Sequence, residues 1–453
     1  MSRRLNQRTF RFIERPQRLA RRFKAGILAA TALLVVLTIG GSSHGRNAIA
    51  WLASRGRWAA IRAVGGKPSR AEIDADWARR RRHDVEQARI RLRKTYDQYD
   101  PAMRRLLDYA GLDPDHALLR WGNFDRVVYL PSTVFEPDED GRSYRLRPLT
   151  RSVWIRNLKL KDGLLAYFPL PDGPQLDELV QAAGAVLVKT SRQTTSSWGL
   201  RGPEPELAAD LRGIVLGDSY MQGLFVGDDE TPVECLKREL SATLKRRAEI
   251  LNTGHLGYSP EQEFFTLRSL AERFPPRFVV LSLFANDFGE LFEVLDGRGD
   301  WEESRYWIEQ ILDYCRTRGI VCLVVPAPWV NQLRGPRRTG HYPGRLPDLI
   351  DVDSLAYLDP IEAFAAETLR LSTGPKASAG AVTANPLFNG GLGDGHFSGA
   401  GCRLWAKSVA ERLILLLNRE DSPPRASASL GSSGHSPMIF TSTRLGRRPS
   451  NSP

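Results

Sequence analysis

The pattern of apolar and charged residues first separates an N-terminal membrane-like segment from the rest of the chain. No Lys, Arg, Asp or Glu occurs in residues 25–45, a run of 21 residues. As a helix this run would span roughly 31 Å, about one hydrocarbon core. The preceding residues 1–24 hold nine Arg and Lys against one Glu and should stay cytoplasmic. The pattern predicts a single-pass signal anchor with the remaining chain periplasmic or extracellular; a cleaved signal peptide would also export it.

Residues 46–111 are predicted to form a membrane-proximal helical stalk. Apolar residues recur three or four apart from Ile73 to Tyr99 among many arginines, which indicates a narrow amphipathic stripe. Asp100-Pro101 then supplies a cap and a first-turn proline for a second helix ending near Gly111. A dimerising coiled coil and a membrane-surface helix remain alternatives for the stripe.

Residues 112–205 lack a helical period and contain short β-prone runs broken by Pro, Asp and Gly. These runs predict a small β-rich accessory segment, whose role the sequence does not indicate. The runs cover residues 126–129, 143–146, 153–155 and 164–168.

Residues 206–418 alternate apolar strands with amphipathic helices, which predicts an α/β domain with a parallel sheet covered by helices. Helix starts are marked by Thr231, Ser259 and Ser398. The Ser/Pro/Arg-rich residues 419–453 should be disordered. About five strands are expected, at residues 213–216, 249–251, 278–283, 320–325 and 355–358.

Charge and cysteine content exclude several function classes. The net charge of +12 lies mostly at the termini, because residues 1–24 carry +8, the tail after residue 418 carries +3, and the part between them carries +1. A nucleic-acid interface is therefore not expected. The four cysteines lack metal-site spacing, so we expect no metal and no other cofactor. Cys315 and Cys322 flank a helix-to-strand turn, and their pairing stays open.

Polar motifs follow the predicted strands, where open parallel sheets bind their ligands. The first strand leads into Gly217-Asp218-Ser219-Tyr220, the third into Ala285-Asn286-Asp287-Phe288, and Asp394-Gly395-His396 precedes the last helix. The second strand leads into a loop from Asn252 to Ser259 that contains Gly257.

With these four motifs in order, residues 211–417 resemble the SGNH/GDSL esterase and lipase family. The resemblance implies a three-layer α/β/α, flavodoxin-like fold, with Ser219 as the nucleophile and His396 as the general base. Two positions depart from the family pattern. Phe284 stands where the third motif usually has glycine, and Asp394 precedes His396 by two residues where the family acid precedes its histidine by three.

The chemistry of acyl transfer fits these residue types. A serine hydroxyl becomes nucleophilic when an imidazole takes its proton, and a carboxylate orients that imidazole. Asp394 is the candidate carboxylate. Stabilising the tetrahedral oxyanion needs preorganised donors, here the N–H groups of Ser219 and Gly257 and the side-chain amide of Asn286.

Other polar residues near these motifs are expected to be structural. Asp218 and Asp287 should hold their turns by hydrogen bonds. His255 and His341 are interpreted as surface or loop histidines, because neither has a partner at a recognisable spacing.

The sequence thus predicts a membrane-anchored, extracytoplasmic serine esterase. The expected substrate is an O-acyl ester, preferentially O-acetyl, on a carbohydrate or cell-envelope polymer, and the bilayer is contacted through residues 25–45. An O-acyltransferase acting on an extracytoplasmic glycan is the alternative. A catalytically inactive binding or scaffold protein of the same fold is a third hypothesis. The oligomeric state is not predicted.

Overall fold

The computed structural model describes the chain from residue 70 to residue 421, with gaps. The predicted basic segment, the anchor at residues 25–45 and residues 422–453 of the predicted tail lie outside the described residues, so the anchor stays a prediction. Residues 419–421, predicted to be disordered, instead end a helix that begins at Gly399. Within the described part, no helix combines the length and apolarity needed to cross a membrane. The gaps are residues 123–125, 139–141, 158–166, 185–186, 290–293, 295–298, 300, 334–340, 351–352, 374–384 and 390–394.

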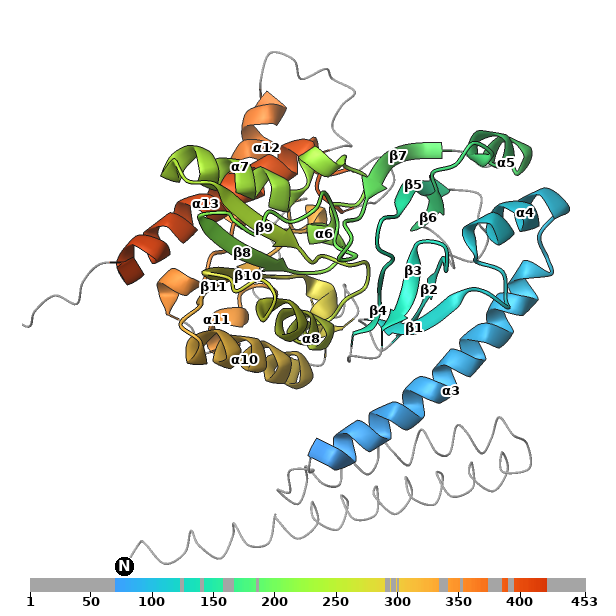
Figure 1. The fold of residues 1–453 in the computed structure, drawn as a ribbon, viewed down its shortest axis with the longest axis horizontal. Helices are drawn as coiled ribbons and strands as arrows, with labels where there is room; N and C mark the ends of the chain where they lie inside the picture. Colours follow the sequence, from blue (N-terminus) through green and yellow to red (C-terminus); the bar gives the residue numbers. More distant parts are fainter. Residues whose placement is uncertain are drawn as a thin grey trace, which may run out of the picture.

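A parallel four-stranded sheet forms the centre of the C-terminal half (Figure 1). Its strands run in the order β11-β10-β8-β9, and each adjacent pair is parallel. Every residue of β9 and β10 is buried, as expected when helices cover both faces. The strands are β8 (Leu211–Leu216), β9 (Ala248–Asn252), β10 (Phe278–Leu283) and β11 (Val321–Pro326).

Helices cover both faces of this sheet and complete three layers (Figure 1). On one face α7 (Pro232–Leu244) packs against α13 (Gly399–Asp421), and on the other α8 (Pro260–Ala271) packs against α10 (Trp301–Thr317). Thr231 caps α7 by accepting a bond from the N–H of Glu234 at 3.1 Å. The predicted α/β fold with a parallel sheet is therefore confirmed. The remaining helices here are α6 (Ser219–Gln222), α11 (Leu346–Leu349) and α12 (Ile361–Thr373).

The predicted fifth strand at residues 355–358 is wrong in the described structure. Residues Ser354–Ala356 form a 3₁₀ turn, and only Tyr357 bridges to Val324 of β11. Asp359 and Pro360 follow directly, and the Asp359 side chain accepts a bond from the N–H of Ile361 as α12 begins. Proline cannot donate to a β-ladder, so the pairing ends after one bridge.

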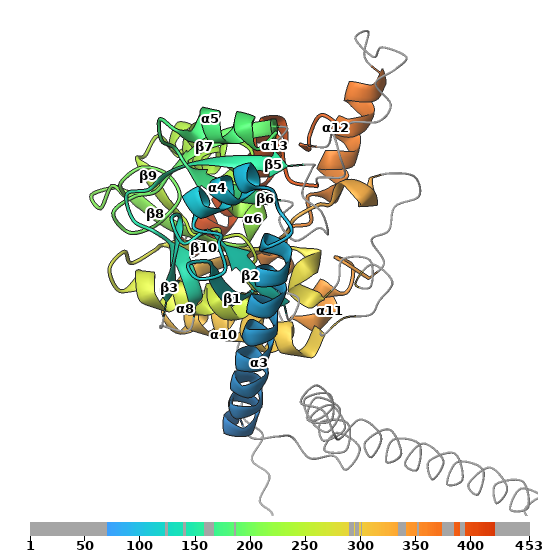
Figure 2. The same cartoon turned by 90° about the vertical axis from the view of Figure 1, so that its right-hand side faces the viewer.

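The N-terminal half combines two helices with three small antiparallel sheets. Helix α3 (Arg70–Tyr96) leaves the body of the molecule (Figure 2), and its Ala88 and Leu92 pack on β1. Asp100 caps α4 (Pro101–Ala110) through the N–H groups of Ala102 and Met103, as predicted. The sheets pair β1 with β2, β3 with β4, and β5 with both β6 and β7.

Within this half, the first three β-prone runs lie in β2 (Arg126–Leu130), β4 (Ser143–Leu146) and β5 (Arg151–Asn157). The fourth, predicted at residues 164–168, overlaps β6 (Tyr167–Pro171) at residues 167–168, and the rest of it lies outside the described residues. Sequence periodicity missed the short helix α5, because seven residues give barely two turns of pattern. It also missed three strands. The missed elements are α5 (Leu176–Ala182), β1 (Leu118–Gly122), β3 (Phe135–Asp138) and β7 (Leu187–Thr194).

One apolar cluster joins the β-rich segment to the central domain. Phe135, Tyr144 and Trp154 from the small sheets share this cluster with Phe225 and Tyr258 of the α/β part, and all five are buried. The β-rich segment therefore packs directly on loops at the carboxyl end of the parallel sheet.

All four cysteines are free thiols. Cys315 and Cys322 are therefore not bonded to each other in this structure. Instead they interact through a hydrogen bond, which together with burial raises the pKa of Cys322 well above its ordinary value.

Candidate active site

Ser219 is the first residue of α6, at the turn where β8 ends. The Asp218 side chain caps this turn by accepting a bond from the N–H of Tyr220 at 2.9 Å. Ser219 is 6% exposed. The turn thus holds the Ser219 hydroxyl at the carboxyl ends of the strands.

His396 reaches the same hydroxyl from the loop before α13. Its Nε2 lies 2.8 Å from the Ser219 Oγ, a hydrogen-bond distance. An imidazole nitrogen at this distance can accept the hydroxyl proton as the oxygen attacks an acyl carbon. The structure therefore brings together the two residues predicted to be nucleophile and base, although they lie 177 positions apart in the chain.

Tyr220 contacts both His396 and the loop that carries it. Its ring lies 4.9 Å from the His396 ring, and its hydroxyl donates to the backbone carbonyl of Gly395 at 2.7 Å. The ring of Phe284 lies 4.3 Å from that of Tyr220. Phe284, which stands at the usual glycine position, therefore packs against the tyrosine that contacts His396. Sequence reasoning missed Tyr220, although it directly follows the nucleophile.

Asn286 lies in the 3₁₀ turn Ala285–Phe288 that follows β10. Its Nδ2 donates to Asp218 Oδ2 at 2.9 Å, and an amide nitrogen carries a second hydrogen that can serve an oxyanion. Burial raises the pKa of the Asp218 carboxyl, while the bonds from Tyr220 and Asn286 act in the opposite direction. Asp218 thus holds both the nucleophile turn and the Asn286 amide, the structural role expected for it.

The loop after β9 packs closely against the backbone of α6. A Cβ on Gly254 would lie 2.1 Å from the backbone nitrogen of Gln222, so only glycine fits there. The Gln222 Oε1 accepts from the N–H of Leu256 at 2.7 Å, and Asn252 donates to the carbonyl of Met221 at 2.9 Å. Sequence reasoning missed both Gly254 and Gln222, since packing against another backbone leaves no motif of its own.

Gly257 adopts a left-handed conformation, with φ at 73°, which glycine accepts without strain. Within the part of the chain that the structure describes, its N–H has no hydrogen-bond acceptor, and neither has the N–H of Ser219. Backbone donors without an internal acceptor are the groups from which an oxyanion hole is built.

His255 is buried, so its interpretation as a surface histidine is wrong, although it does lie in a loop. Its Nδ1 donates to the carbonyl of Thr253 at 2.8 Å, and its ring stacks on Tyr258 at 4.4 Å. Burial lowers the pKa of His255 to about 4, so the ring is neutral near pH 7. His341 is exposed in a turn, as predicted.

Asp394 lies outside the described residues. The carboxylate that would orient His396 therefore remains a prediction.

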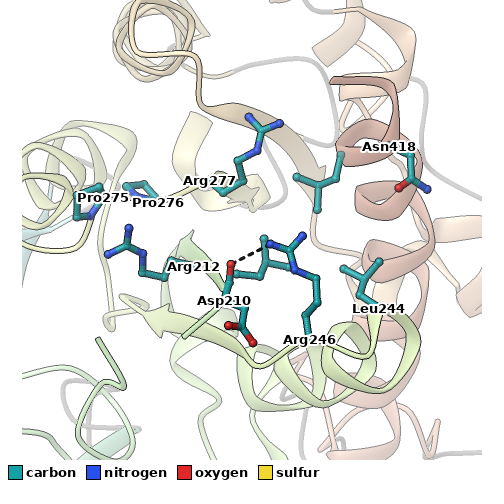
Figure 3. Close-up of a pocket in the computed structure, with 10 residues that line it drawn as sticks. Asp210, Arg212, Leu244, Arg246, Pro275, Pro276, Arg277 and Asn418 are labelled. Carbon is teal, nitrogen blue, oxygen red and sulfur yellow. Dashed lines mark hydrogen bonds between the residues drawn. The ribbon is translucent and has the colours of Figure 1, made fainter. Parts of the chain in front are cut away.

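A cavity of about 330 Å³ lies at the other end of the strands, where β8 and β10 begin. Figure 3 shows Arg212, Arg246 and Arg277 around it, near the amino ends of β8 and β10 and the end of α13. None of the predicted site residues lines this cavity, so it is separate from the Ser219–His396 centre.

No model of a known protein family matches the chain, and no curated protein matches it either. Similar solved structures include the psychrotrophic esterase EstA from Pseudoalteromonas sp., at 15% identity over 46% of this chain and 100% of that one, with a TM-score of 0.33. The acetyl xylan esterase AlAXEase gives 16% identity over 46% and 99%, with a TM-score of 0.34. The lipase/acylhydrolase from Enterococcus faecalis gives 18% identity over 46% and 96%, with a TM-score of 0.32.

Proposed function

We propose that this chain, whose fold resembles that of SGNH/GDSL esterases and lipases, is a serine esterase that cleaves O-acyl esters through an acyl-serine intermediate. The observation that carries the proposal is the 2.8 Å contact between Ser219 Oγ and His396 Nε2. The Asn286 amide is held near this contact through Asp218, which accepts bonds from both Asn286 and Ser219.

In the proposed reaction, Ser219 Oγ attacks the ester carbonyl carbon as its proton passes to His396 Nε2. The carbonyl oxygen then carries negative charge, which the N–H groups of Ser219 and Gly257 and the Asn286 amide stabilise. The C–O bond to the alcohol breaks, and the alcohol leaves with the proton from His396. Water, deprotonated by His396, next attacks the acyl-serine and releases the acid. Asp394 is the proposed orienting carboxylate.

We further propose an extracytoplasmic, membrane-anchored enzyme whose preferred substrate is an O-acetyl group on a carbohydrate or cell-envelope polymer. The charge-free run at residues 25–45 after a basic segment supports export. The similar solved structures include an acetyl xylan esterase.

Fluorophosphonate labelling of the full-length protein tests the nucleophile. We expect wild type to be labelled, and Ser219→Ala and His396→Ala to lose labelling and the hydrolysis of p-nitrophenyl acetate. In other serine hydrolases such losses are on the order of 10⁴–10⁶ in kcat. Asp394→Asn in the same assay tests the third residue. A folded wild type that is neither labelled nor active would rule out the enzyme and favour the inactive scaffold.

The acyl-serine could also be resolved by a sugar hydroxyl in place of water. Hydrolysis is therefore followed with and without an acetylation-competent oligosaccharide. Appearance of acetylated oligosaccharide at the expense of free acetate would favour the transferase, whereas acetate release that ignores the acceptor supports the esterase.

A further inference from the structure

The hairpin formed by β3 and β4 contacts the loop that contains Gly257. The Tyr144 hydroxyl donates to the carbonyl of Leu256 at 2.5 Å. In return, the Tyr258 hydroxyl donates to the carbonyl of Tyr144 at 2.5 Å, and Gln262 Nε2 donates to the carbonyl of Arg142 at 2.7 Å. The β-rich segment, to which the sequence assigned no role, thus bonds directly to the proposed oxyanion loop.

The carbonyl that Tyr144 holds belongs to the same peptide group as the N–H of Gly257. A peptide group is planar, so fixing the direction of its C=O also fixes the direction of its N–H. Glycine at position 257 makes this peptide free to rotate, because its φ of 73° is only one of several conformations open to it. A bond to the carbonyl also polarises the amide and strengthens its N–H as a donor.

Leu256 is held from both sides. Its N–H donates to Gln222 of α6 at 2.7 Å, while its carbonyl accepts from Tyr144. Tyr144 itself is fully buried and packs edge-on against Tyr258 at 5.3 Å and Phe135 at 6.1 Å. Burial raises the pKa of the Tyr144 phenol well above its ordinary value, so the hydroxyl keeps its proton and remains a donor.

We propose that Tyr144 is a positioning residue for the oxyanion hole, which orients the Gly257 N–H through the Leu256–Gly257 peptide. The catalytic unit then includes the β3–β4 hairpin as well as residues 206–418. This inference rests on the proposed esterase function.

Tyr144→Phe in the full-length protein removes the one hydroxyl and keeps the ring. We expect kcat for p-nitrophenyl acetate to fall roughly tenfold, with KM within about twofold, because the Gly257 N–H remains but loses the one hydrogen bond that orients its peptide group. Tyr258→Phe is the matched control, because it also loses a buried 2.5 Å bond from a phenol to a backbone carbonyl. Its kcat should stay within about twofold of wild type, although both variants lose similar thermal stability.

A second substitution covers the case in which Tyr144→Phe does not fold. Site-specific 3-fluorotyrosine at position 144 keeps the ring and gives a more acidic donor, so kcat should be retained or rise. Equal kcat values for Tyr144→Phe and Tyr258→Phe, or a fall in kcat with 3-fluorotyrosine, would overturn the role of Tyr144. Absence of any Ser219-dependent turnover in wild type would instead overturn the esterase function and, with it, this inference.

Discussion

The two ends of the parallel sheet differ in the burial and hydrogen bonding of their polar side chains. At the carboxyl ends of the strands, Ser219, Asp218 and Asn286 are at most 7% exposed and are joined by hydrogen bonds. At the amino ends, arginines line an open cavity of about 330 Å³ (Figure 3), and Arg246 is exposed and donates to the carbonyl of Asp210 at 3.0 Å. Neither Ser219 nor His396 lines this cavity.

Buried, hydrogen-bonded polar groups therefore distinguish the proposed site from the open, arginine-lined cavity. Burying a polar group costs free energy unless it is hydrogen-bonded. The hydrogen bonds among Ser219, Asp218 and Asn286 offset this cost. Exposed arginines cost little to place and contribute little.

Outside the proposed nucleophile and base, the largest effect on activity should come from Asn286→Ala. Removing this proposed oxyanion donor should lower kcat by on the order of 10²–10³ with little change in KM, because the proposed interaction forms only in the transition state. Steady-state kinetics on p-nitrophenyl acetate measures both constants. The variant also removes a partner of Asp218, so the assay is run below the melting temperature measured by circular dichroism.

The control for Asn286→Ala is Arg246→Ala, at the amino ends of the strands. It should leave kcat within about twofold, since a solvated arginine there touches none of the site residues. A loss in Arg246→Ala as large as that in Asn286→Ala would break the distinction between the two ends.

A smaller effect is expected from Tyr220→Phe, which keeps the ring against His396 and removes the bond to the Gly395 carbonyl. The histidine loop then loses one tether, and kcat should fall roughly 3- to 10-fold, about 1 kcal/mol. The fluorophosphonate labelling rate should fall in the same proportion, because it depends on the same Ser219–His396 contact. Unchanged labelling with a lower kcat would mean that Tyr220 acts on a later step.

Much of this arrangement could be predicted from the sequence, and the rest fails for identifiable reasons. Strand-end motifs identified Ser219 and His396 because each motif is a local string beside an apolar run. Gln222 and Tyr144 were missed because their roles depend on backbone carbonyls and amides 34 and 112 positions away. Such contacts leave no spacing to read in a single chain. The small strands were incompletely predicted because runs of four or five residues are too short to establish a period.

The smallest effect on activity should come from Glu263→Gln. This variant instead tests whether the buried Glu263, near the carboxyl ends of the strands, is protonated in the folded protein. Glu263 of α8 is 1% exposed, and neither carboxyl oxygen has a hydrogen-bond partner in the described part of the chain. Burial, with Asp287 and Asp218 nearby, raises the pKa of Glu263 well above 4.5. The folded state thus keeps a proton that the unfolded state releases above pH 4.5, so this group makes wild type less stable as pH rises from there towards its folded pKa.

Glu263→Gln cannot lose that proton. Its free energy of unfolding relative to wild type should therefore increase with pH above 4.5, by at most about 1.4 kcal/mol per pH unit, while kcat stays within about twofold. Urea denaturation at pH 5, 6 and 7 measures the slope, with Glu261→Gln at a half-buried position of the same helix as the control. Parallel stability curves for wild type and Glu263→Gln would mean that Glu263 is ionised in the folded protein. In that case the carboxyl end holds an unpaired buried charge, and the contrast with the solvated arginines would rest on the hydrogen-bonded cluster of Ser219, Asp218 and Asn286 alone.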